Sequence, residues 1–344
     1  LFFSLETNTS VVYFSVFKEI VGHKNIIRYI ENVSASDQVS HAYILNGEKG
    51  SGKRLLADFF AMDLQCEDRE PDGEACGRCH SCRQAMSGNQ PDIIFIRHEK
   101  PNTISVEEIR TQLNNDIVIR PYSSKYKIYI VPHADKMSVQ AQNALLKTIE
   151  EPPEYAVIIL LTENAEILLP TIRSRCVILK LRNIKDQLIK KYLMEQMEIP
   201  DYKADICAAF AQGNMGKAIS LASSEHFNEI KEEIVHLLRD INEMETAELI
   251  EAVKKCSEFK LDINDYFDMI AIWYRDVLIY KATLSVDRVV FSDQLKYIKE
   301  RAKKSSYEGI GIILNALETA KGRLKANVNF ELTIELLLLT IKEN

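Results

Sequence analysis

Residues 42–53 read Ala-Tyr-Ile-Leu-Asn-Gly-Glu-Lys-Gly-Ser-Gly-Lys. A short apolar run with strand character leads into glycines and a lysine, and the apolar spacing from Lys53 to Leu64 is helical. A glycine-rich turn between a strand and a helix can point backbone N–H groups at phosphate oxygens, and the helix N-terminus adds a favourable dipole. The stretch therefore predicts a phosphate-binding loop, with a plain strand-to-helix turn as the alternative. The candidate contacts to ATP or ADP are Gly47, Gly50, Gly52 and Lys53.

Two features that hydrolysing phosphate-loop proteins use to hold Mg²⁺ differ in this sequence. The residue after Lys53 is Arg54, where the motif has a Ser or Thr hydroxyl. The apolar run Lys127–Val131 ends in Pro132 and His133, where acidic residues are expected. The sequence therefore predicts a site that does not hydrolyse nucleotide and leaves nucleotide binding open.

Further apolar runs of the same kind extend the pattern from the loop outward. Near-continuous apolar runs are typical of strands buried on both faces of a parallel sheet, and helical patterns lie between them. This alternation predicts an α/β domain with a parallel sheet. After Arg182, helical spacing dominates and predicts an all-helical second half. The expected strands are Ala42–Asn46, Ile93–Arg97, Lys127–Val131, Ala156–Thr162 and Val177–Leu181, and the helices between them are Lys53–Leu64, Val106–Asn115 and Ser138–Glu150.

The composition is that of an ordinary globular protein. Of 344 residues, 46% are apolar and 27% are charged, which excludes disorder as a description of the whole chain. No apolar run approaches the roughly 20 residues of a membrane-spanning helix. The net charge of −7 disfavours free-standing nucleic-acid binding, so any DNA contact is expected to be local or shared with partner subunits.

Four of the seven cysteines lie close together in the sequence. Three of them have C-x-x-C spacing, which brings thiolates together around a tetrahedral Zn²⁺. Four thiolates fill the coordination sphere, so the pattern predicts a structural zinc site in a reducing cytoplasm rather than a catalytic one. His80 lies within the cluster and is expected to be a spectator. The predicted ligands are Cys66, Cys76, Cys79 and Cys82.

Taken together, several motifs resemble one family. The sequence is similar to the AAA+ subunits of the bacterial DNA polymerase III clamp loader, from Phe17 to the C-terminus and less closely after Lys217. The motifs that carry the resemblance are Phe17-Lys-Glu-Ile-Val-Gly-His23, His41-Ala42, the phosphate loop, the four-cysteine insertion, Ala141-Gln-Asn-Ala-Leu-Leu-Lys147, Glu150-Glu-Pro-Pro153 and Ser174-Arg-Cys176.

The resemblance implies a role and a set of partners. The sequence departs from the ATP-hydrolysing gamma/tau motors at Arg54, at Pro132-His133 and at Gly216. It matches them at Ser174-Arg-Cys176. This combination resembles the delta-prime branch of the family. It implies a stator without ATPase activity of its own within the polymerase III holoenzyme, which helps load the sliding clamp onto primed DNA. Thr162 matches a polar sensor position, and Arg175 an arginine finger that serves a neighbouring subunit. The implied partners are gamma/tau and delta subunits, with the clamp and primed DNA reached through the complex, and no membrane.

The resemblance also divides the chain. It implies an AAA+ domain over 17–182 with a zinc module at about 62–90, a helical lid over 183–222 and a helical collar over 223–344. Residues 1–16 are expected to be an N-terminal extension outside the matching block, with its native status left open, and Val16 is a hypothetical initiator directly before Phe17. Two alternatives remain open, a gamma-like motor and a stand-alone nucleotide kinase. The motor needs a hydroxyl at position 54, where this sequence has Arg54. The kinase needs acidic residues at the strand end, where this sequence has Pro132 and His133.

Overall fold

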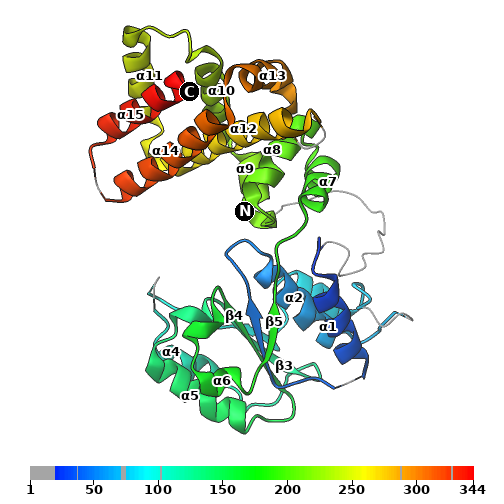
Figure 1. Ribbon diagram of the computed structural model, residues 1–344. Coiled ribbons are helices and arrows are strands. Elements are labelled where there is room, and N and C mark those ends of the chain that lie inside the picture. Colours follow the sequence, from blue (N-terminus) through cyan, green and yellow to red (C-terminus); the bar gives the residue numbers. More distant parts are fainter. Residues whose placement is uncertain (1–19, 37, 71–74, 101–102, 287–288, 327) are drawn as a thin grey trace. The chain divides into compact units, whose positions relative to one another are not determined.

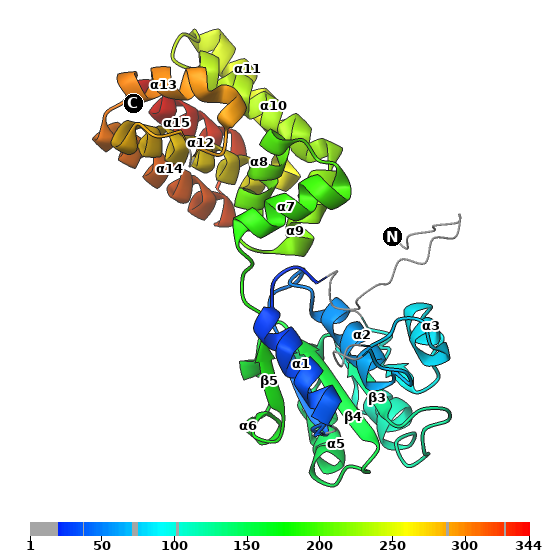
Figure 2. The same cartoon turned by 90° about the vertical axis from the view of Figure 1, so that its right-hand side faces the viewer.

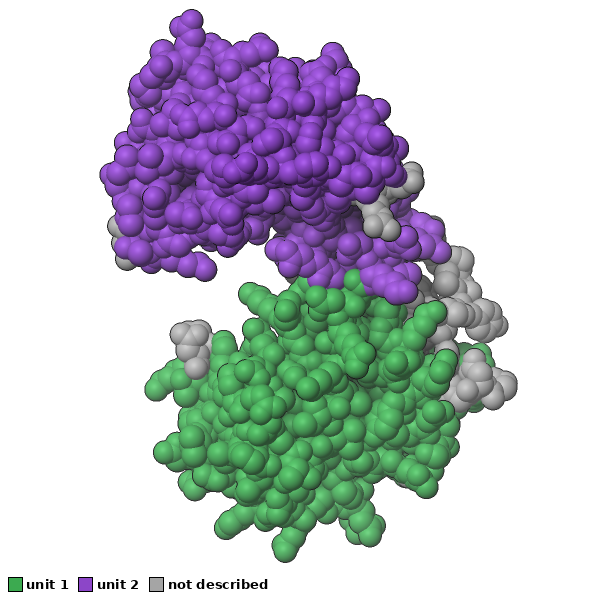
Figure 3. Space-filling view, viewed as in Figure 1, with its two compact units in different colours: residues 1–184, 214–216 green, residues 185–213, 217–344 purple. Residues whose placement is uncertain are grey.

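The computed structural model describes residues 20–36, 38–70, 75–100, 103–286, 289–326 and 328–344. The chain divides into two compact units (Figure 3): Leu1–Ile184 with Asn214–Gly216, and Lys185–Gly213 with Lys217–Asn344. The expected extension over 1–16 lies outside the described residues. The finer division of the helical part into 183–222 and 223–344 stays a prediction.

The first unit is built on a parallel sheet, as the sequence predicts. The strand order is β2-β3-β4-β1-β5, and every pair of neighbours is parallel. Strands β1, β3 and β4 have the predicted bounds, whereas β2 ends at Phe95 and β5 ends at Lys180. The strands are β1 (Ala42–Asn46), β2 (Ile93–Phe95), β3 (Lys127–Val131), β4 (Ala156–Thr162) and β5 (Val177–Lys180).

Helices cover both faces of this sheet (Figure 2). Side chains alternate along a strand, so one set of residues from β1, β3 and β4 packs against α1 and α2. The other set packs against α4, α5 and α6. Because both faces are covered, β3 and β4 are buried along their whole length. The helices of these layers are α1 (Lys24–Ser36), α2 (Lys53–Leu64), α4 (Val106–Ile109), α5 (Val139–Glu150) and α6 (Pro170–Arg173).

The helix predicted from Val106 begins as expected and then changes type. Ser105 and Glu108 form the capping box that their spacing predicts. Residues Arg110–Asn114 form a π-helix, in which Asn115 N–H donates to the Arg110 carbonyl at 2.9 Å. The segment is helical as predicted, and the change to a π-helix is not indicated by the sequence pattern. The other short elements of the unit are α3 (His80–Met86) and the 3₁₀ helices Ala134–Lys136 and Ala165–Ile167.

The second unit is helical, as predicted (Figure 1). The sequence pattern does not mark two of the helices individually. The glycines at 213 and 216 obscure the start of α9, and α13 is so charged that only Ile298, Arg301 and Ala302 are buried. The elements are α7 (Asp186–Met197), α8 (Asp201–Ala211), α9 (Met215–Ser223), α10 (Glu225–Asp240), α11 (Thr246–Glu258), α12 (Ile263–Thr283), α13 (Leu295–Lys304), α14 (Tyr307–Lys325) and α15 (Phe330–Glu343), with 3₁₀ turns at Lys260–Asp262 and Ser292–Gln294. None of the described helices combines the length and the apolar character needed to span a bilayer.

A buried carboxylate connects α12 to the segment before α13. Asp276 is fully buried, and its Oδ2 accepts hydrogen bonds from the N–H groups of Val290 and Phe291, both at 2.8 Å. It lies one turn after Trp273, the single tryptophan of the chain, which is also buried. These two hydrogen bonds fix the backbone directly before the 3₁₀ turn Ser292–Gln294.

Asp276→Ala is expected to lower the free energy of unfolding of the helical unit by about 2–4 kcal/mol, because it leaves two buried N–H groups without an acceptor. Urea unfolding followed by Trp273 fluorescence measures this change. The control is Glu300→Ala on the exposed face of α13, expected to change the value by less than about 0.5 kcal/mol. Equal losses in the two variants would contradict a special role for Asp276.

Candidate functional site

The predicted phosphate loop joins β1 to α2 in the expected position. Gly50 and Gly52 have φ values of +84° and +92°, which residues with a Cβ rarely adopt. Gly52 directly precedes α2, so the loop opens onto a helix N-terminus. At Gly47 a Cβ would lie 2.7 Å from Ser51 Oγ. The backbone conformation of the loop therefore favours glycine at positions 50 and 52, and a side chain at position 47 would require Ser51 to move.

The carbonyl groups of the loop accept hydrogen bonds from side chains and backbone groups of the same unit. Lys53 Nζ donates to the Gly47 and Glu48 carbonyls, the second at 2.8 Å. Asn214 Nδ2 donates to the Lys49 carbonyl at 2.7 Å, and Gly216 N–H donates to the Gly50 carbonyl at 2.9 Å. Asn214 and Gly216 belong to the first unit. Desolvation by burial lowers the pKa of Lys53.

The guanidinium group of Arg54 contacts two residues of the same unit, Asp58 and Phe95. Its Nε donates to both carboxylate oxygens of Asp58, at 2.9 and 3.0 Å. Its Cζ lies 3.7 Å from the centre of the Phe95 ring, at the end of β2. Neither contact was predicted, although the spacing of four residues between Arg54 and Asp58 is a recognisable helical pair.

The edge of the sheet next to the loop carries His133 and Thr162. His133 follows β3, is exposed, and has a φ of +53°. Desolvation and the nearby Lys136 lower its pKa. Thr162 ends β4 with its side chain buried, and its Oγ1 accepts from the Asn164 N–H at 3.2 Å. Asp135 joins the two strand ends, since its Oδ1 accepts from the Glu163 N–H at 3.1 Å.

Arg175 lies on the surface between α6 and β5. Its Nη2 pairs with Glu150 Oε1 at 2.9 Å, and its Nη1 donates to the Thr171 carbonyl at 3.0 Å. About 42% of its side chain is exposed, so the guanidinium group is accessible to solvent. Glu150, the last residue of α5, was not identified as a partner from the sequence. Arg173, two residues earlier, pairs with Glu166 instead.

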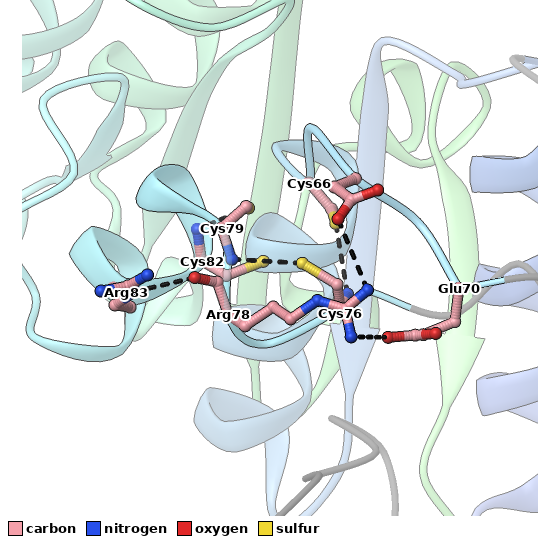
Figure 4. A network of polar contacts seen from close by, with 8 residues as sticks. Cys66, Glu70, Cys76, Arg78, Cys79, Cys82 and Arg83 are labelled. Carbon is pink, nitrogen blue, oxygen red and sulfur yellow. Dashed lines mark hydrogen bonds and ion pairs between the residues drawn. The ribbon is translucent and has the colours of Figure 1, made fainter. Parts of the chain in front are cut away.

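The four predicted cysteines come together. Their Sγ atoms all lie within 4.8 Å of one another, and His80 is exposed and outside the group. Backbone N–H groups of Cys76, Cys79 and Cys82 each donate to the sulfur of the preceding cysteine in the cluster, at 3.3, 3.2 and 3.4 Å. Figure 4 shows the cluster beside the ion pair between Arg78 and Glu70. This donor set could hold a metal ion.

The cluster is chemically suited to a soft metal. The Cys82 thiol and backbone N–H groups lower the pKa of Cys66 to about 5, so a thiolate is readily available. A tetrahedral metal with bonds of about 2.3 Å places its sulfurs about 3.8 Å apart, which is compatible with the observed grouping. Arg69, which follows Cys66, pairs with the buried Asp63 of α2 at 2.9 Å and connects the cysteine module to the sheet unit.

Comparison with known protein families gives two matches. A family model described as DNA polymerase III, delta subunit, matches residues 22–185. A second, described as DNA polymerase III, delta subunit, C terminal, matches residues 206–343. The two models together cover most of both units.

Individual relatives agree with these models. The DNA polymerase III subunit delta' of Bacillus subtilis (strain 168) is 29% identical over 322 residues, which cover 92% of this chain and 95% of the relative. The subunit delta' of Pseudomonas aeruginosa is 27% identical over 304 residues, covering 88% and 91%. The subunit tau of B. subtilis is 27% identical over 344 residues, but this chain spans only 60% of its length.

Two glycine-to-alanine substitutions are expected to change the free energy of unfolding in opposite directions. Gly52→Ala meets no atom within 4 Å, so its cost of about 1–2 kcal/mol comes only from the left-handed backbone. Gly311 lies within α14 and also has no close neighbours. Gly311→Ala is expected to raise the free energy of unfolding by about 0.5–1 kcal/mol, because glycine destabilises a helix interior relative to alanine. Hydrogen exchange of peptides from α2 and from α14 measures each effect in its own unit. Stabilisation of α2 by Gly52→Ala would contradict the assigned backbone conformation.

Proposed function

Since the chain belongs to the DNA polymerase III delta subunit family, we propose that it is the delta-prime, or stator, subunit of a bacterial clamp loader. The observation that carries this proposal is the similarity to the B. subtilis subunit delta' along nearly the whole of both chains. In this role the protein assembles with gamma/tau and delta subunits in the cytoplasm. The complex then places a sliding clamp on primed DNA.

We further propose that this subunit does not hydrolyse ATP. Arg54 stands where a hydroxyl would hold Mg²⁺, and its ion pair with Asp58 and its contact with Phe95 keep it at the protein surface. His133, which replaces an acidic residue, is a poor ligand for a hard cation. The similarity to tau favours a motor as the second candidate, but a motor requires both of these positions to be different.

Nucleotide binding without hydrolysis is compatible with the loop geometry. Gly50 and Gly52 give the loop its left-handed backbone conformation, Gly47 opens the loop, and Lys53 lies at the start of α2. To contact a phosphate, Lys53 would have to release its hydrogen bonds to the Gly47 and Glu48 carbonyls. Thr162 offers a hydroxyl at the adjacent strand end.

Arg175 is proposed as an arginine finger that acts on a neighbouring motor subunit. A planar guanidinium group stabilises the charge that develops on the transferred γ-phosphoryl group. The exposure of Arg175 supports this role, and its pairing with Glu150 positions the side chain before a partner arrives. An exposed ion pair contributes about 0–1 kcal/mol, so breaking it costs little.

The cysteine cluster is proposed to hold a structural Zn²⁺. Four sulfur ligands occupy all positions of a tetrahedral ion and leave none for water. The ion would fix the short loops of the module, whose own apolar core consists of Met62, Ala75, Cys76 and Cys82 with few neighbours. Metal binding then supplies stability that so small a core lacks.

Purified protein is expected to contain about one zinc ion per chain. Cys79→Ser should lose most of this zinc and increase proteolysis within the module, whereas Cys176→Ser, whose thiol lies outside the cluster, should keep it. Elemental analysis by mass spectrometry and limited proteolysis measure the two effects. Wild-type protein without zinc after purification free of chelators would overturn the assignment.

Arg175→Ala is expected to leave the isolated chain folded and to lower clamp- and DNA-stimulated ATP turnover of the reconstituted complex. A finger supplied in trans is worth on the order of 10³–10⁵ at a single site, and the loss should be smaller in a ring whose motors use one another's fingers. Arg175→Lys should restore little, since a point charge cannot reproduce the planar fork.

The matched control for this experiment is Arg173→Ala, which removes a neighbouring arginine paired with Glu166. Size-exclusion chromatography verifies that every ring is assembled. Equal ATP turnover by rings with wild-type and Arg175→Ala subunits would show that Arg175 does not act as an arginine finger. Metal-dependent ATP turnover by the isolated wild-type chain, abolished by Lys53→Ala, would favour the motor instead.

A further inference from the structure

Three consecutive carbonyl groups of the phosphate loop accept hydrogen bonds from residues outside the loop. Two of the donors, Asn214 and Gly216, come from the helical half of the sequence but belong to the first unit. The third donor, His23, directly precedes α1. The pairs are Asn214 Nδ2 with the Lys49 carbonyl at 2.7 Å, the Gly216 N–H with the Gly50 carbonyl at 2.9 Å, and His23 Nε2 with the Ser51 carbonyl at 3.2 Å.

These contacts also orient the N–H groups of the loop. In a trans peptide the C=O and N–H bonds point in opposite directions, so binding the three carbonyl groups from outside directs the N–H groups of Gly50, Ser51 and Gly52 away from the donors. The Ser51 N–H donates to the Glu48 carbonyl at 3.1 Å. Within the part of the chain that the structure describes, the Gly50 and Gly52 N–H groups have no acceptor. They remain available to an anion.

Gly216 reaches the loop because it has no side chain. A Cβ at this position would lie 2.7 Å from both the Cα and the carbonyl oxygen of Gly50. These are backbone atoms, and the backbone of Gly50 is already in a conformation that favours glycine, with a φ of +84°. Neither partner can therefore move aside for a methyl group, and alanine at position 216 would separate this segment from the loop.

The connection that carries the two donors is short and sterically restricted. Helix α8 ends at Ala211 and α9 begins at Met215. Between them, Gln212 and Gly213 both have left-handed backbone conformations, with φ values of +50° and +86°. Asn214 follows directly. Its side chain is therefore presented by a tight turn between two helices, which limits the positions that its Nδ2 can take.

We infer that Asn214 and Gly216 are positioning residues that hold the phosphate loop in a single conformation before any nucleotide is bound. Their hydrogen bonds prevent the Lys49 and Gly50 carbonyl oxygens from turning towards the anion site, where they would repel phosphate. A loop ordered in advance loses less conformational entropy when a ligand arrives. The inference uses contacts within the first unit and does not rest on the clamp-loader role. Its one link to the proposed function is nucleotide binding.

The first test measures tryptic cleavage after Lys49 in the full chain without nucleotide. Lys49 is exposed, so the cleavage rate reports how often the loop opens. Asn214→Ala loses one hydrogen bond and should raise this rate about fivefold. Gly216→Ala loses the other and brings a methyl group against the backbone of Gly50, so the rate should rise at least about tenfold. Cleavage after Arg97, which is exposed in the same unit, should not change.

Each variant has a matched control in the helical unit. Asn228→Ala removes the same kind of hydrogen bond, from Nδ2 to the Ser224 carbonyl at 3.0 Å. Gly311→Ala adds a methyl group that meets no atom within 4 Å. Both controls should be cleaved after Lys49 at the wild-type rate. The inference would be wrong if Asn214→Ala and Gly216→Ala were also cleaved at the wild-type rate. An equal increase after Arg97 would overturn it as well, because the substitutions would then loosen the whole unit.

A second test separates this inference from the proposed binding of nucleotide. Because ADP would bind only the folded loop, a saturating concentration should slow cleavage after Lys49 by a similar factor in the wild type and in both variants. If ADP has no effect on any of these chains while the variants are still cleaved faster, the two positioning roles are supported and nucleotide binding is not.

Discussion

Strand β1 is hydrogen-bonded on both sides, and the rest of the first unit is arranged by this pairing. Asn46 lies in register with Thr162 of β4 and Lys180 of β5. The bonds continue past the strand, since Gly47 N–H donates to the Thr162 carbonyl at 3.1 Å and Leu181 N–H to the Asn46 carbonyl at 2.8 Å. The phosphate loop therefore starts at a fixed point of the sheet. Parallel neighbours end at the same edge, which brings the ends of β3 and β4 beside it.

Two arginines in this unit are held by different sets of neighbours. Arg54 has two hydrogen bonds to one carboxylate and lies over an aromatic ring, so releasing it breaks several interactions together. The Arg175 side chain is 42% exposed, compared with 55% for Arg54, and it is held by one carboxylate, one carbonyl and the Ser174 hydroxyl. Each of the two side chains is therefore oriented by residues of its own unit while it stays accessible to solvent.

Local features of this structure could be predicted from the sequence, whereas contacts between distant residues could not. Strands β3 and β4 are buried on both faces, so their apolar runs are unbroken and their bounds were predicted correctly. At the edge of the sheet β5 is less covered, with Ile178 38% exposed, and its end was placed one residue late. The cysteine cluster could be predicted because three of its members, Cys76, Cys79 and Cys82, are close in the sequence at C-x-x-C spacing. No pattern within one sequence indicates that Arg54 meets Phe95 or that Arg175 meets Glu150, since these pairs form only when the sheet assembles.

The same pairing sets an order of events during synthesis. The chain leaves the ribosome from its N-terminus, so β1 emerges early, but both of its partners, β4 and β5, come after the cysteine module. The pairing of β1 on both sides is complete only after residues up to Lys180 have been synthesised. The four thiols, separated only by short loops, can close around a metal ion well before that point. On the nascent chain, the cysteine module would then fold before β1 has paired with β4 and β5.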